Sequence, residues 1–316
     1  MRRLRHRIAV LSIALLALAV FCLAATPEQL IASGSVDEAI RTLSGRNDAA
    51  SLNLLSRAYY AIEQWDSAVS FGEKAVAAAP DKSLYHLWLG RSYGQKASSV
   101  NPLSAASLAR KTQAQFEKAV QLDAANVQAH ADLAEYDTDA PSFMGGGVDK
   151  AREQASQVSK YDQATSHWIL ALIAEKEKRY PDAEKELMEA TRVANDPAQY
   201  EMNLASFYRR RGRLDDMQKA ITQAIARANK NAEVYYNAAS ELFQSKQDFA
   251  SAAQYLRHYL DSGAMVEDAP AFRAHYLLGQ IYEKMGNKLD AVAEYKASLS
   301  LASGFAPASK ALTRTQ

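Results

Sequence analysis

The amino-acid sequence predicts an all-α protein in which about seven helix-turn-helix units stack into a solenoid. Most successive units begin roughly 34 residues apart, and the longer intervals carry visible insertions. Within each unit, apolar residues recur at helical spacing, and a small residue always stands at the eighth place. A period of this length is typical of a repeat architecture. The units begin at Ala49, Ser83, Val127, Ala164, Ala198, Ala232 and Phe272.

The first helix of each unit is predicted from places 4, 7, 8 and 11, which share one face of a helix. The seventh place is leucine in six units, and the eighth is serine, glycine or alanine. Small side chains at the eighth place would let a second helix approach closely. That second helix is indicated by alanine at place 20 in four units and by a large apolar residue at place 24. Each unit is therefore expected to be a helical hairpin.

Two short stretches carry a resemblance to a known family. HLWLGRSY, residues 86–93, and HYLLGQIY, residues 275–282, both read H-x-x-L-G-x-x-Y. Together with the second-helix places and Pro80, they resemble the tetratricopeptide repeat, whose pattern is W-x2-L-G-x2-Y, then A-x3-F, then P. The resemblance covers roughly residues 49–305 and implies a right-handed α-solenoid whose concave face is lined by first helices. The third unit departs from the pattern, because Asp137 stands where the tyrosine belongs.

Residues 1–25 predict a secretory signal peptide, with an uncleaved N-terminal anchor as the alternative. MRRLRHR is followed by an uncharged apolar run from Ile8 to Ala25 that ends in small residues. Both interpretations send the rest of the chain across the cytoplasmic membrane, so we expect a periplasmic or secreted protein. The loop PSFMGGGVDKA, residues 141–151, also resembles loops of exported bacterial tetratricopeptide proteins. Residues 26–48 are expected to form N-terminal capping helices, and residues 306–316 a C-terminal tail.

Charge and cysteine content narrow the classes of partner. Cys22 is the one cysteine and lies in the signal segment, so the mature chain would depend on packing rather than on disulfides. Loss of the four arginines in that segment takes the formal charge from +1 to −3. This balance favours neither nucleic acid nor an anionic membrane surface. The expected partner is a protein or peptide segment, and the membrane is reached only through a possible uncleaved anchor.

Histidine occupies the fourth place in four units. Equivalent places on successive repeats lie at least about 8 to 10 Å apart, whereas metal ligands stand about 2 Å from one ion. We therefore predict packing residues and expect no metal, no cofactor and no catalytic group. Because the family pattern puts tryptophan here, the flat ring rather than its nitrogens should matter, and His→Phe should be tolerated. The histidines are His86, His130, His167 and His275.

Candidate partner-binding residues lie on a separate stripe of the first helices, at places 2, 5, 9 and 12. In the family that this chain resembles, the stripe lines the concave groove, where aromatic side chains bury much area at low entropic cost. Asn237 and Arg273 fit that family's clamp for a peptide carboxylate. Met202, Ser206 and Leu277 do not fit it, so a more apolar segment is expected. The candidates are Trp168, Tyr236, Tyr276, Phe243, Tyr60, Arg209 and Arg273.

Two hypotheses for the function come from these patterns. The first is an exported scaffold or adaptor, without catalysis, that holds a protein or peptide partner in its concave groove. The alternative is an enzyme or cofactor-carrying envelope protein, whose site would be built by the inserted loops near Asn101 and Gly145.

Overall fold

The computed structural model describes residues 25–229 and 231–316, so the expected signal segment up to Ala24 lies outside the described residues. The described part contains 17 α-helices and no β-strand, which confirms the all-α solenoid. The elements are α1 Pro27–Ser33, α2 Val36–Leu43, α3 Ala49–Ala61, α4 Trp65–Ala78, α5 Ser83–Ala97, α6 Pro102–Leu122, α7 Val127–Asp139, the 3-10 helix η1 Ser142–Met144, α8 Val148–Val158, α9 Gln163–Lys176, α10 Tyr180–Val193, α11 Pro197–Arg210, α12 Leu214–Arg227, α13 Glu233–Gln244, α14 Phe249–Asp261, α15 Ala271–Lys284, α16 Lys288–Leu301 and α17 Ala306–Thr315.

Seven hairpins run from α3–α4 to α15–α16, and every first helix starts within one residue of its predicted unit start. The small residue at the eighth place explains how closely the two helices approach. A Cβ atom added to Gly90 would lie 2.6 Å from the ring of Phe116. At Gly279 the same atom would lie 2.5 Å from the ring of Tyr295. A larger side chain at either glycine would push the second helix away.

Side-chain caps mark the start of several first helices. The Asp48 carboxylate accepts a hydrogen bond from the Ser51 N–H at 2.9 Å, and the Asp162 carboxylate accepts one from the Thr165 N–H at 2.7 Å. Each bond satisfies one of the free N–H groups at a helix N-terminus. The hydrogen bonds from Ser51 hold the pKa of Asp48 below its usual value. Such a side-chain cap is present at α3, α7, α9 and α11.

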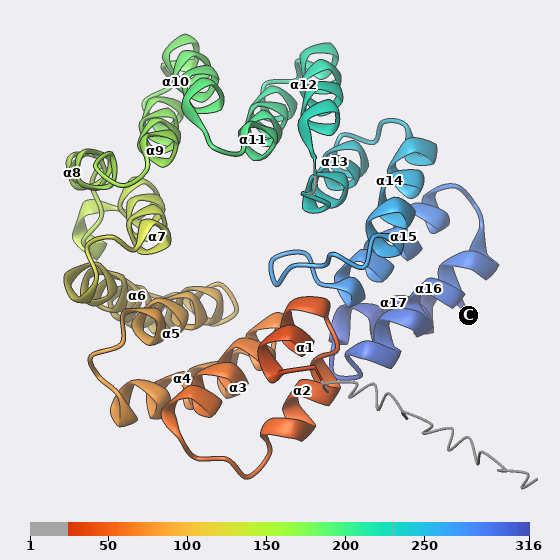
Figure 1. Cartoon of the computed structure of the whole chain (residues 1–316), viewed down its shortest axis with the longest axis horizontal. Coiled ribbons are helices and arrows are strands. Elements are labelled where there is room, and N and C mark those ends of the chain that lie inside the picture. The colour runs from red at the N-terminus through yellow and green to blue at the C-terminus, as the bar shows by residue number, and fades with distance from the viewer. Residues whose placement is uncertain (1–24, 230) are drawn as a thin grey trace, which may run out of the picture.

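The solenoid closes on itself as a ring, which the sequence did not lead us to expect. Figure 1 shows the chain passing from α3 round to α15, with α1 and α2 beside α16 and α17. From α7 to α14 the first helix of each hairpin faces the inside of the ring and the second faces the outside. The loop between α14 and α15, residues 262–270, reaches into the middle of the ring.

We call the contact between α1–α3 and the segment from residue 262 to α17 the seam. Its apolar part joins Leu30 and Ile31 to Phe272 and Phe305, whose rings meet edge to face at 5.0 Å. Its polar part includes a hydrogen bond from the Ser303 N–H to the Asp37 carboxylate at 2.9 Å. The segments expected as capping helices and C-terminal tail, residues 26–48 and 306–316, contain α1, α2 and α17 and take part in this contact.

In the part of the chain that the structure describes, no helix combines the length and the apolar character needed to cross a membrane.

Candidate functional site

A cavity of about 430 Å³ lies inside the ring where the seam meets the first helices. We call it the seam cavity. Its walls come from α3, α4, α5, α13, α15 and the loop at residues 262–270. Four aromatic side chains and five charged ones line it, namely Tyr60, Trp65, Trp88, Tyr236, Arg57, Arg273, Glu63, Glu267 and Asp268.

The aromatic wall of the seam cavity is a packed cluster. The ring of Tyr60 meets Trp65 and Trp88 edge to face, each at 5.4 Å between ring centroids. The guanidinium groups of Arg57 and Arg91 lie over the Trp88 ring at 5.2 and 4.8 Å. Burial raises the pKa of Tyr60, so its phenol stays neutral. The wall is a rigid apolar surface that also attracts cations.

The arginines of this cavity hold the two ends of the chain together. Arg57 on α3 and Glu267 on the loop form a bidentate ion pair, in which the Arg57 Nε–H donates to Glu267 Oε1 at 3.0 Å. Arg273 on α15 donates to the Ala61 carbonyl at 2.8 Å and lies 3.2 Å from the Glu63 carboxylate. The residues of each pair are about 210 positions apart. The cavity therefore exists only in the closed ring.

Two further cavities continue the seam cavity along the inside of the ring. The α5–α7 cavity, about 410 Å³, shares Tyr60 and Gln95 with it. The α11–α13 cavity, about 250 Å³, shares Asp268 with it. We call the residues that line these three cavities the inner wall. A surface drawn from successive first helices suits an extended ligand better than a compact one.

The inner wall is acidic. Three arginines line it, Arg57, Arg91 and Arg273, against eight carboxylates. Five of the carboxylates have an ion-pair partner: Glu63, Asp132, Asp139, Glu241 and Glu267. Among the residues described, the other three, Glu135, Glu233 and Asp268, take part in no ion pair.

The environment of the inner wall disfavours negative charge. Desolvation raises the pKa of Glu135, and the charges of Asp132 and Asp139 raise it further. Desolvation likewise raises the pKa of Glu233, and the charge of Asp268 adds to this effect. A cation placed near Glu135 and Glu233 would stabilise their ionised forms and lower both pKa values.

The structure brings together three of the seven predicted partner-binding residues. Tyr60, Tyr236 and Arg273 all line the seam cavity. The remaining four lie elsewhere. Trp168 is half-buried between two apolar clusters, Tyr276 packs on Tyr295 and Phe305, Phe243 packs on Phe249, and Arg209 pairs with Glu241.

Sequence reasoning missed Trp65, Trp88, Glu267 and Asp268. Trp88 stands at place 6 of its unit and Trp65 at the start of a second helix, outside the stripe assigned to the groove. Glu267 and Asp268 lie in the insertion that lengthens the interval between the sixth and seventh units. The extra length of this interval was the one sign in the sequence that these residues are special. The sequence does not show that the inserted loop points into the ring, because the ring forms only when the two ends of the solenoid meet.

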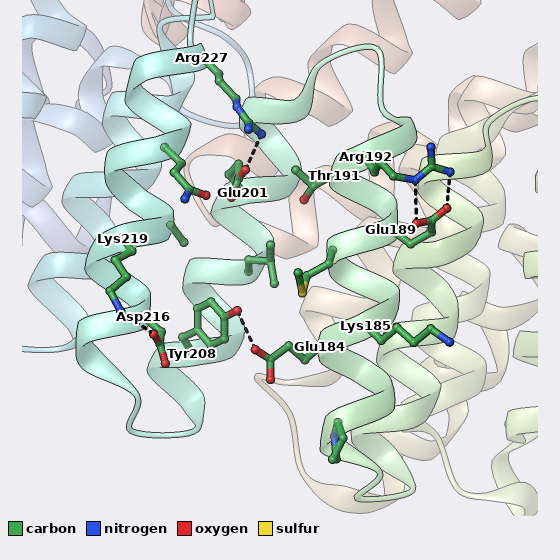
Figure 2. A pocket seen from close by; sticks show the side chains of 15 residues that line it. Glu184, Lys185, Glu189, Thr191, Arg192, Glu201, Tyr208, Asp216, Lys219 and Arg227 are labelled. Carbon is green, nitrogen blue, oxygen red and sulfur yellow. Dashed lines mark hydrogen bonds and ion pairs between the residues drawn. The ribbon is translucent and has the colours of Figure 1, made fainter.

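A larger cavity of about 850 Å³ lies on the outer side, between α10, α11 and α12 (Figure 2). Glu201 and Ala220 line it, at places where four other units set a histidine against a glutamate or glutamine. Glu201 is buried and pairs with Arg227 at 2.6 Å, and Tyr208 donates to Glu184 at 2.9 Å. Four acidic and four basic side chains line this outer groove. Its charges are balanced, unlike those of the inner wall.

The fourth-place histidines are packing residues that also form hydrogen bonds. His86 is buried, with Nε2 2.9 Å from the Pro80 carbonyl and Nδ1 2.6 Å from Gln115 Oε1. Both partner atoms are oxygens, so both contacts are hydrogen bonds if each ring nitrogen carries a hydrogen or if the Gln115 amide is turned to present its NH2 to Nδ1. His130 repeats this arrangement with Gln154. His275 instead donates to the Glu294 carboxylate at 2.6 Å. The nitrogens therefore matter, contrary to our expectation from the sequence.

The inserted loops near Asn101 and Gly145 have structural contacts of their own. Asn101 caps α6 by accepting from the Ser104 N–H at 3.1 Å. The Gly145 carbonyl accepts from Gln113 at 2.9 Å and from Lys150 at 2.6 Å. Within residues 25–229 and 231–316, no group of three or more histidine, cysteine, aspartate or glutamate side chains is placed to hold a metal ion.

Two segments, residues 145–200 and residues 272–305, match models of the tetratricopeptide repeat. These two segments are therefore similar to tetratricopeptide repeats. Proteins with such repeats are typically protein-interaction scaffolds, and the fold is generally non-catalytic. No curated protein matches the sequence.

Three solved structures to which the chain is similar share little sequence with it. The APC/C hetero-tetramer Cut9-Hcn1 is 13% identical with a TM-score of 0.42; the match covers 92% of this chain and 53% of that one, so this chain spans about half its length. A tetratricopeptide repeat protein from Parabacteroides merdae ATCC 43184 is 15% identical with a TM-score of 0.43, over 89% of this chain and 98% of that chain. Pseudomonas aeruginosa pilF is 16% identical with a TM-score of 0.39, over 73% and 97%.

Proposed function

We propose that this protein is an exported scaffold that holds an extended segment of a protein partner against the inner wall and catalyses no reaction. The observation that supports the proposal is the continuity of three cavities along first helices, from α7 through α5 and α3 and across the seam to α15, α13 and α11. Aromatic side chains at the centre of that surface can bury a partner's apolar groups, while charged groups around them set its register. Export rests on the apolar run before Ala25.

The proposal is tested by capture of partners from a native envelope extract with the immobilised mature chain. We expect the double variant Tyr60→Ala, Tyr236→Ala to lose the captured protein. Gln95→Trp, which fills the boundary between two inner cavities without removing a core residue, should weaken capture as well. Met188→Ala with Leu289→Ala, two exposed changes on second helices, is the matched control. Circular dichroism confirms folding, and undiminished capture by both inner-wall variants contradicts the proposal.

Export is tested separately. The full-length chain is produced in a Gram-negative host, cells are fractionated, and the mass of the accumulated protein is measured. A periplasmic product that has lost the segment up to Ala24 or Ala25 supports a cleaved signal, whereas a cytoplasmic full-length product contradicts export.

A further inference from the structure

We propose that the segment bound at the inner wall is basic, and that its lysine or arginine side chains pair with Glu135, Asp268 and Glu233. This inference rests on the proposed function and names the chemistry of the partner. The sequence alone favoured a more apolar segment, because it did not reveal which carboxylates face the inside of the ring.

The charge of the inner wall selects a cationic partner. The outer groove has equal numbers of acidic and basic side chains, whereas carboxylates outnumber arginines by eight to three on the inner wall. The arginines are already engaged, because Arg57, Arg91 and Arg273 pair with Glu267, Asp132 and Glu63. An acidic segment would meet no cation without an ion-pair partner and would be repelled by Glu135, Asp268 and Glu233.

The three carboxylates are spread along the inner wall rather than gathered at one point. Glu135 on α7 lines the α5–α7 cavity, and Glu233 on α13 lines the α11–α13 cavity. Asp268 lies between them, on the boundary shared by the seam cavity and the α11–α13 cavity. A ligand that pairs with all three must extend over the three cavities, and a chain with several cationic side chains can do so.

The aromatic wall supplies the second half of the recognition. Lysine and arginine carry long apolar stems that pack on aromatic rings, and their cationic ends are attracted to the ring faces. The chain itself shows this chemistry, since Arg57 and Arg91 both lie over Trp88. Tyr60, Trp65 and Tyr236 are partly exposed and line the same cavity.

The probe is a fluorescein-labelled peptide in which arginine alternates with serine, compared with one in which glutamate alternates with serine. Binding to the mature chain is followed by fluorescence anisotropy at low and at physiological salt. We expect the arginine peptide to bind and the glutamate peptide not to bind. Affinity for the arginine peptide should fall as salt rises, because the contacts are charged and partly exposed.

The triple variant Glu135→Gln, Glu233→Gln, Asp268→Asn keeps the shape of each side chain and removes three charges. We expect it to weaken binding of the arginine peptide by about tenfold or more, the combined effect of three modest ion pairs. The control variant Asp81→Asn, Asp149→Asn, Asp290→Asn removes three exposed charges away from the inner wall and should bind as the parent does.

The inference is overturned if the glutamate peptide binds as well as the arginine peptide, or if both triple variants weaken binding equally. The second result would mean that net charge alone attracts the probe. Either result leaves the scaffold proposal standing as long as Tyr60→Ala, Tyr236→Ala abolishes capture of the native partner, so the two proposals fail separately.

Discussion

The junction between α10 and α11 and the seam both bury apolar side chains, but their residues come from different parts of the repeat pattern. At the junction, Ala183, Leu187 and Ala198 share one core with the following repeats, and all are repeat places or lie next to them. At the seam, Phe305 lies after the last hairpin, and Glu267 lies in an insertion. The junction between adjacent repeats is therefore packed by residues of the repeat pattern. The seam instead depends on residues that lie outside this pattern.

Two glycines illustrate the same difference between a contact within a repeat and a contact across the seam. Gly90 is needed because the second helix of its own hairpin lies against it. Gly34 has a φ of +90°, and a Cβ atom there would lie 2.6 Å from the Ala271 nitrogen across the seam. Both the left-handed backbone and the close approach demand glycine at this position. The comparison indicates that ring closure is a specific contact rather than a by-product of superhelical curvature.

The largest effect should come from removing one buried ring at each kind of contact. Phe305 and Phe207 are both 1% exposed, and each substitution to alanine should cost about 3 to 5 kcal/mol. Phe305→Ala should open the closed solenoid, because Phe305 shares one apolar cluster with Leu30 and Ile31 on the other side of the seam. Small-angle scattering should then show a larger radius of gyration with unchanged helicity. Phe207→Ala should lower stability without changing the radius of the folded state. Equal radii of gyration for the two variants would contradict the conclusion that Phe305 holds the ring closed and Phe207 does not.

The second-largest effect on stability is expected in the hairpin α7–α8, where Asp137 replaces the tyrosine of the repeat pattern. Asp137 is 2% exposed, its Oδ1 has no hydrogen-bond partner among the described residues, and burial raises its pKa to about 7. The folded protein therefore retains a proton that the unfolded chain releases between about pH 4 and 7, and the free energy of unfolding falls as pH rises through that window.

Asp137→Asn removes this penalty. We expect the variant to be more stable than the parent by about 2 to 4 kcal/mol at pH 8 and equal to it below about pH 4. Urea unfolding at several pH values measures the difference. Asp149→Asn, whose side chain is 95% exposed, is the control and should show no such dependence. A parent protein whose stability rises between pH 4 and 7 through this residue would refute the assignment.

A smaller effect is expected at the histidines. His86→Phe keeps a flat ring but leaves the Pro80 carbonyl and the Gln115 amide without their partner, so it should cost about 1 to 3 kcal/mol. His275→Phe should cost less, because its side chain is 24% exposed and water can solvate Glu294. Thermal and urea unfolding of the two variants measure the difference. Equal tolerance would restore the interpretation that only the ring matters.

The smallest effect should come from the ion pair across the seam. Arg57 and Glu267 are 16% and 18% exposed, so a double-mutant cycle of Arg57→Gln and Glu267→Gln should give a coupling energy of about 1 kcal/mol. The same cycle at Arg192 and Glu189, where the arginine is 69% exposed, should give less. A coupling that does not decrease in high salt would argue against a charged contact.

Part of the candidate site could be predicted from the sequence. Tyr60, Tyr236 and Arg273 were expected to line a groove because places 2, 5 and 12 of a first helix face the inside, and they do line one cavity. Trp168 and Tyr276 satisfied the same rule but pack against neighbouring helices. Spacing identifies the face of a helix, but it does not show how much of that face a neighbour covers.

The sequence by itself determined the hairpins, their number and their first residues, because each depends on contacts within one repeat or between adjacent ones. The small residue at the eighth place and the apolar stripes of the helices act over a few turns of helix, and they recur often enough to be recognised. Only the tertiary structure decided that the solenoid closes, that the loop at residues 262–270 enters the ring, and that Arg57 meets Glu267. Closure depends on small rotations summed over seven hairpins, and the residues that it joins are too far apart in the chain for any local pattern to relate them.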